Sequence, residues 1–136
     1  QMSFSALFAN IQWIPVIITT ALSFVIGFVW HSPYLFGKTW KSLTFPKGGP
    51  SKLNAPLIFG GTAILHIMAL SCLSALVYGQ GELNGLIIGF VISFVWILPA
   101  MGGTYLFANR SLKLLAIDAG MYLVLFSVSG FILGAW

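Results

Sequence analysis

Charged residues are scarce in this sequence. Asp, Glu, Lys and Arg together make up 6% of the 136 residues, whereas hydrophobic residues make up 59%. A soluble domain of this size needs a large polar surface around its core, so this composition excludes an ordinary water-soluble domain. The basic residues number only six and are better explained as orientation signals beside membrane spans. We therefore expect no nucleic-acid partner.

Cysteine is almost absent as well. Cys72 is the only one, which excludes an internal disulfide and the paired thiols of redox enzymes that resemble vitamin K reductase. No His, Cys and acidic residues have metal-ligand spacing, and no glycine-rich phosphate loop follows a strand. No serine has a nearby base to make it a nucleophile. The sequence therefore predicts no metal, no cofactor and no catalytic residues.

Four long apolar runs fill most of the chain. A bilayer core of about 30 Å requires about 20 apolar residues in a helix, and each run reaches that length. The runs are unbroken and do not alternate, and an open sheet could not satisfy its edge amides in lipid. We predict an all-α membrane protein, a single domain over 1–136 with four transmembrane helices in an antiparallel bundle. The expected spans are about 11–30, 56–78, 85–106 and 112–136.

The positive charges predict the orientation of the chain. Four lysines lie in the loop 31–55, and the gap before the fourth span carries Arg110, with Lys113 just inside the next helix. The middle gap carries only Glu82. Four spans place the first and third gaps on the same side, and positive residues are retained in the cytoplasm. We therefore expect a cytoplasmic loop 31–55 and both termini outside, in the cell membrane, the bacterial inner membrane.

The loop after the first span contains an amphipathic segment. Phe36, Trp40 and Leu43 fall on one helical face, while Lys38 and Lys41 point elsewhere. This pattern predicts a short interfacial helix with its rings at the acyl boundary and its ammonium groups among lipid phosphates. The candidate residues for binding a lipid headgroup are His31, Lys38, Trp40 and Lys41. The alternative is a plain interfacial anchor.

This stretch also resembles a known family. The pattern Trp-x-Ser-Pro-x-Leu-Phe-Gly-Lys-x-Trp, from Trp30 to Trp40, is similar to the signature of DUF1761, a family of small, mostly bacterial membrane proteins of unknown function. The resemblance extends along the chain, with a basic turn before the fourth span and Trp136 at the end. It implies a four-helix membrane domain and no established activity.

Two ionisable residues fall inside predicted spans. His66 lies about 15 Å into the second span and Asp118 about 9 Å into the fourth. A charged aspartate at such depth costs on the order of 2.5–3.5 kcal/mol, so we expect Asp118 to face other helices. The partner of Asp118 is either His66, or else Arg110 or Lys113. The candidate intramembrane polar site consists of His66, Asp118, Tyr122 and Thr62.

Small residues recur at helix-packing spacing in the last two spans. Gly85 and Gly89 are four residues apart in the third span, as are Gly130 and Gly134 in the fourth. Such spacing lets helix backbones approach closely in lipid. We expect spans three and four to cross there, or these glycines to mediate dimer contact.

The sequence supports two main hypotheses for function. The first is a small membrane component that is not an enzyme, either a homo-oligomer or an accessory to a partner membrane protein, in contact with membrane lipids. The alternative is a proton-coupled or small-solute transport unit that uses His66 and Asp118. A weaker third hypothesis is an enzyme that acts on lipid through Lys38, Lys41 and His31.

Overall fold

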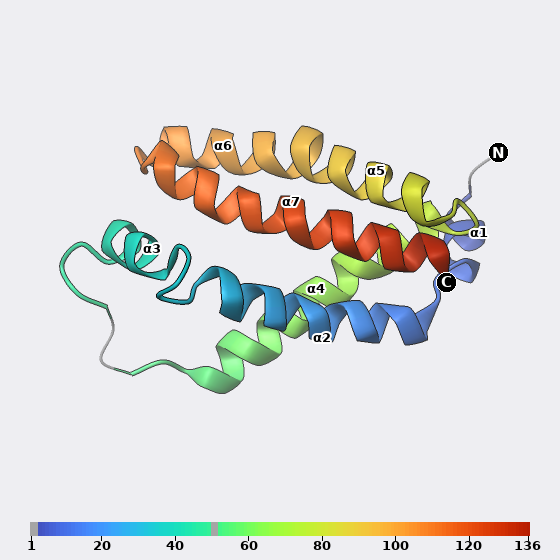
Figure 1. Cartoon of the computed structure of the whole chain (residues 1–136), viewed down its shortest axis with the longest axis horizontal. Coiled ribbons are helices and arrows are strands. Elements are labelled where there is room, and N and C mark those ends of the chain that lie inside the picture. Colours follow the sequence, from blue (N-terminus) through green and yellow to red (C-terminus); the bar gives the residue numbers. More distant parts are fainter. Residues whose placement is uncertain (1–2, 50–51) are drawn as a thin grey trace.

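The computed structural model describes residues 3–49 and 52–136, and the regular structure in these ranges is entirely helical. The elements in chain order are α1 (Phe4–Ala9), α2 (Trp13–Trp30), α3 (Gly37–Thr44), α4 (Ala55–Val77), α5 (Glu82–Ile92), the π-helical segment η1 (Ser93–Ile97), α6 (Leu98–Phe107) and α7 (Leu112–Ala135). Figure 1 shows α3 at the opposite end of the molecule from α1 and the C-terminal end of α7.

Four helical segments are long and apolar enough to cross a membrane. They are α2, α4, the continuous segment α5–η1–α6, and α7, with lengths of 18, 23, 26 and 24 residues. At 1.5 Å per residue even the shortest reaches about 27 Å, close to the thickness of a bilayer core. The predicted all-helical membrane fold is confirmed, and the chain is a multi-pass membrane protein.

Polar side chains mark where two of the long helices begin. The Asn54 side chain accepts a hydrogen bond from the Leu57 amide at the start of α4, and Pro56 occupies the first turn of that helix. Ser111 caps α7 by accepting from two backbone amides. These caps satisfy amides that the helix itself leaves without acceptors, and proline is tolerated there because its missing donor is not needed.

The first long helix is shorter than the apolar run suggested. We expected a span of about 11–30, but α2 begins at Trp13, and the residues before it form the separate short helix α1. The break at Asn10–Gln12 is held by the Gln12 amide, which donates to Ser74 Oγ at 3.0 Å on α4. This contact fixes the start of α2 against the end of α4.

The third membrane segment changes its helical geometry in the middle. The π-helical segment η1 precedes Pro99, whose ring nitrogen cannot donate to a carbonyl one turn earlier. In the turn before η1, Ser93 Oγ donates to the carbonyls of Gly89 and Phe90. The irregularity before the proline thus takes the form of one wide turn.

Helix α7 contacts every other membrane segment and lies along α5–η1–α6 over its whole length (Figure 1). The two backbones approach closely at Gly85 and Gly130, where a methyl group added to either residue would collide with the carbonyl of the other. Gly134 lies equally close to Gly81, and Gly89 to the Phe126 carbonyl. The predicted packing glycines therefore meet within one chain, between α5 and α7.

A sealed apolar core fills the end of the molecule near α1. Its buried members come from α2, α4 and α7 and are Val16, Leu70, Leu73, Val77, Leu125, Phe126 and Leu133. Toward the opposite end the helices leave space between them, and His31, Arg110 and Asp118 line part of it. The core thus closes one half of the molecule and leaves the other half available for a site.

Candidate functional site

The segment from Trp30 to Trp40 forms a compact turn that carries α3 back onto α7. The Phe36 amide donates to the Trp30 carbonyl at 3.1 Å, and the Gly37 amide donates to the Ser32 carbonyl at 3.0 Å. A Cβ on Gly37 would collide with the carbonyl oxygens of His31 and Ser32. Glycine is therefore the residue that this tight turn accepts.

Trp30 fixes one side of this turn to α7. Its indole Nε1 donates to the Ile117 carbonyl at 2.8 Å. The Trp30 ring covers Gly120, where an added Cβ would approach the ring to 3.1 Å. Trp30 at the end of α2 is therefore a contact between helices.

Trp40 fixes the other side of this turn to α7. Its Nε1 donates to Asp118 Oδ1 at 3.0 Å, and its ring meets the ring of His31 edge-on, with centroids 4.9 Å apart. We expected Trp40 to lie in the acyl boundary; the contact that the structure gives its N–H is with Asp118, an acid that lipid would leave unsolvated. Lys38 and Lys41 of α3 are exposed, so the structure does not bring them to the same place as Trp40 and His31.

Asp118 is satisfied by neutral donors. Besides Trp40, the buried Tyr105 donates its hydroxyl to Asp118 Oδ2. The Arg110 guanidinium lies over the Tyr105 ring, 4.6 Å from its centre. The two partners considered from the sequence, His66 and a basic residue in direct contact, are thus replaced by Trp40 and Tyr105. Both oxygens of this half-buried carboxyl group therefore have a hydrogen-bond donor.

His66 pairs with α2 and has one fixed tautomer. Its Nδ1 lies 2.8 Å from Ser23 Oγ, while Ser23 donates its only hydroxyl hydrogen to the Thr20 carbonyl at 2.5 Å. Ser23 must therefore accept from His66, so Nδ1 carries a hydrogen. In the neutral ring Nε2 is then an acceptor. His31 follows the same logic, because its Nδ1 lies 2.9 Å from the Gly27 carbonyl, which can only accept.

Two adjoining cavities connect these groups, and together we call them the chamber. The polar cavity has a volume of about 300 Å³ and is lined by His31, Trp40, Thr44, Arg110, Asp118 and Met121. The apolar cavity, also about 300 Å³, is lined by Leu65, His66, Ala69, Leu70, Ile97, Leu125 and Phe126. Met101 and Tyr122 line both cavities and form the boundary between them.

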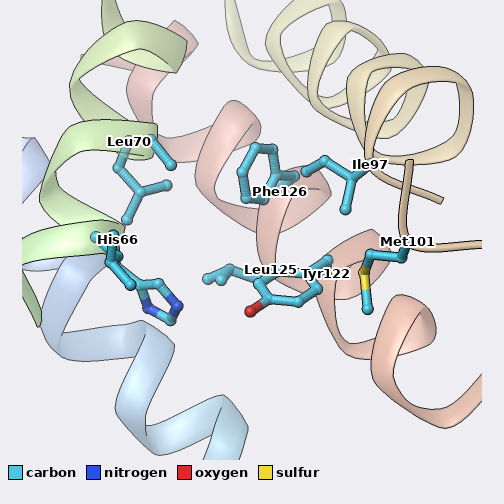
Figure 2. A pocket seen from close by; sticks show the side chains of 9 residues that line it. His66, Leu70, Ile97, Met101, Tyr122, Leu125 and Phe126 are labelled. Carbon is cyan, nitrogen blue, oxygen red and sulfur yellow. The ribbon is translucent and has the colours of Figure 1, made fainter. Parts of the chain in front are cut away.

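Figure 2 shows the apolar cavity between α4 and the η1–α6 segment, with α7 behind it. The His66 ring and the Tyr122 hydroxyl point toward the space between them, and their ring centroids are 6.2 Å apart. Leu65, on the rim, is 64% exposed, so the cavity reaches the outer surface of α4.

The structure brings together three of the four residues of the predicted intramembrane site. His66, Tyr122 and Asp118 line the chamber, whereas Thr62 is not among the described residues that line it. The sequence analysis did not select Tyr105 or Thr44, because neither carries a charge or belongs to a recognised motif. The one signal for Tyr105 is its position five residues before Arg110, which allows a cation–π contact.

The described residues, 3–49 and 52–136, hold no group of three His, Cys, Asp or Glu side chains that could bind a metal ion. Cys72 is exposed on α4, away from the chamber residues. The polar groups of the chamber are instead one acid, one guanidinium, two imidazoles and hydroxyls. They suit hydrogen bonding to an organic molecule or the movement of protons.

The fold and the site define a small, multi-pass membrane protein whose chamber joins a polar cavity to an apolar one. The model of the family described as "Protein of unknown function (DUF1761)" matches residues 14–134, and the chain belongs to this family. The resemblance noted at Trp30–Trp40 is thereby confirmed. Neither a curated protein nor a solved structure matches the chain at a significant level.

Proposed function

We propose that this protein is a non-enzymatic component of the cell membrane that binds a small molecule in its chamber. The observation that carries the proposal is the shared boundary of the two cavities, because Met101 and Tyr122 join a polar space to an apolar one. Asp118 and the two histidines are each held by fixed hydrogen bonds, which is typical of groups that position a ligand or stabilise the fold.

Filling the chamber tests this proposal. Met101→Trp places a large ring at the boundary of both cavities, while Met68→Trp introduces the same ring on the 65% exposed face of α4. Small molecules that remain with the protein after purification from its native membrane would be compared by mass spectrometry. We expect at least one species with the wild type and Met68→Trp that is lost from Met101→Trp. Retention of every species by a folded Met101→Trp protein would exclude binding in the chamber.

A proton-coupled or small-solute transport unit is the second candidate. It is supported by the facing His66 ring and Tyr122 hydroxyl, with Asp118 in the wall of the adjoining cavity. Proteoliposomes with an internal pH dye would measure proton flux under an imposed gradient. The transport hypothesis requires His66→Ala and Asp118→Asn to slow the flux, so unchanged rates in both variants would exclude it.

We also propose that the loop after α2 is cytoplasmic, that both termini are outside, and that copies of the chain associate with one another or with a partner membrane protein. The charge distribution supports the orientation. The bare backbone at Gly60 and Gly61 on α4 supports association, because an added Cβ there would meet no atom within 4 Å. Native mass spectrometry in lipid nanodiscs would measure the number of copies.

A further inference from the structure

We infer that the chamber binds a single-chain amphiphile with an anionic headgroup, which enters from the surrounding lipid. This inference rests on the proposed binding function and names the ligand class for it. The headgroup lies in the polar cavity beside Arg110, and the hydrocarbon chain passes Met101 and Tyr122 into the apolar cavity.

The order of the two cavities matches the shape of such a molecule. Arg110 is exposed in the turn between α6 and α7, so the polar cavity opens near the end of the membrane spans, where lipid headgroups lie. The apolar cavity is deeper along the same helices, and its polar side chains are His66 and Tyr122. The head therefore lies in the cavity that carries Arg110, Asp118 and Thr44, and the tail lies in the cavity lined mainly by aliphatic and aromatic side chains.

The charges at this end favour an anion. Arg110 lines the polar cavity, and Lys41 and Lys113 are exposed at the same end of the molecule, whereas Glu82 lies at the other end. Asp118 is the acid in this wall, and both of its oxygens already accept hydrogen bonds. The guanidinium, stacked on Tyr105, presents N–H donors in a plane that suits a phosphate or carboxylate.

Thr44 gives independent support for a headgroup in the polar cavity. It lines the polar cavity at the end of α3, and its buried hydroxyl has no hydrogen-bond partner within residues 3–49 and 52–136. A buried hydroxyl without a partner is costly, and a headgroup oxygen in the cavity is the acceptor that it lacks. Arg110 and Thr44 thus offer donors from two different elements.

The opening of the apolar cavity explains why the ligand comes from the bilayer. Leu65 on α4 and Ile97 on η1 lie on opposite walls, and the exposed position of Leu65 places the rim at the lipid-facing surface. A hydrocarbon chain can therefore enter sideways without crossing water. The sealed core around Leu70 and Phe126 limits how far it extends.

Native mass spectrometry of the full-length protein in detergent would test this inference with four probes of equal chain length: hexadecyl phosphate, hexadecanoate, hexadecanol and hexadecyltrimethylammonium. We expect the two anionic probes to bind one per chain, with at least about tenfold higher affinity than the other two. Inorganic phosphate alone should not bind, because it lacks the chain. Comparable binding of hexadecanol would overturn the inference.

Single substitutions test where the headgroup binds. Arg110→Gln and Thr44→Val should each weaken hexadecyl phosphate binding, the first by about tenfold. Lys113→Gln removes a charge at the same end but outside the cavity wall, so it should bind normally. If Arg110→Gln binds like Lys113→Gln, the assigned headgroup site is wrong. If a neutral or cationic probe binds and is lost in Met101→Trp, the ligand class fails and the chamber function remains. Probe binding that Met101→Trp leaves unchanged would contradict both.

Discussion

At Asp118, two neutral donors from distant parts of the chain meet one carboxylate. Trp40 lies 78 positions away in the sequence, and Tyr105 lies 13 positions away. The depth of Asp118 in an apolar run predicted that it needs partners, because lipid cannot solvate a charge. Its partners could not be predicted, since indole and phenol donors carry no charge and look like ordinary interfacial residues.

Trp40→Phe tests this link. The change keeps an aromatic ring beside His31 but removes the N–H that donates to Asp118. We expect a loss of about 1.5 kcal/mol in the free energy of unfolding, because a hydrogen bond to a charged group is lost. Thermal unfolding in detergent would measure it, and hydrogen exchange of the α3 amides should become faster. Trp96→Phe, at a 66% exposed ring, is the control, and equal effects of the two changes would contradict the assigned role.

Ser23→Ala tests the His66 tautomer. In the wild type Nδ1 of His66 carries the hydrogen because Ser23 accepts from it. Removal of the hydroxyl should let the neutral ring populate both tautomers, which nitrogen NMR of the imidazole distinguishes by chemical shift. The His31 signals should not change, since that ring is held by the Gly27 carbonyl. A single unchanged His66 tautomer in Ser23→Ala would disprove this account.

Among the elements, the pair α5 and α7 is packed most closely. The glycine spacing predicted close packing of these two spans but left a dimer contact open, because a packing face has the same sequence whichever copy it meets. The structure uses the glycines within one chain. By contrast, the contact of α3 with α7 and the π-helical turn before Pro99 depend on tertiary partners and on geometry that local spacing does not specify.

Gly130→Ala should separate the two helices. The added methyl would meet the Gly85 carbonyl, so backbones must move apart, with a cost of about 1–3 kcal/mol. A lower unfolding temperature in detergent would show it. Gly103→Ala adds the same methyl on α6, where no atom lies within 4 Å, and should unfold like the wild type. Equal stability of the two variants would contradict the close crossing.

For the whole molecule, the number and length of the apolar runs were sufficient to predict the all-helical membrane fold, because hydrocarbon accepts a helix that satisfies its own backbone. The shape of the chamber was not predictable. It depends on where α4 and the η1–α6 segment diverge over α7, which no run length or charge count expresses.

The expected orientation of the chain in the membrane predicts which residues an external reagent can reach. In a Cys72→Ser background, Glu82→Cys should react with a membrane-impermeant maleimide in intact cells, because the turn between α4 and α5 is expected outside. Lys47→Cys should react only after the membrane is opened, because the loop after α3 is expected in the cytoplasm. Labelling of both positions from the same side would refute the four-span topology.

The link between Trp40 and Asp118 also has a consequence for biosynthesis. Both donors to Asp118 precede it in the chain, so they are synthesised before α7. A peptide of residues 112–135 alone would bring its carboxylate into hydrocarbon without them and would carry the full cost of about 2.5–3.5 kcal/mol. Contact with the earlier segments offsets this cost, and the direction of translation supplies those segments before α7 is complete.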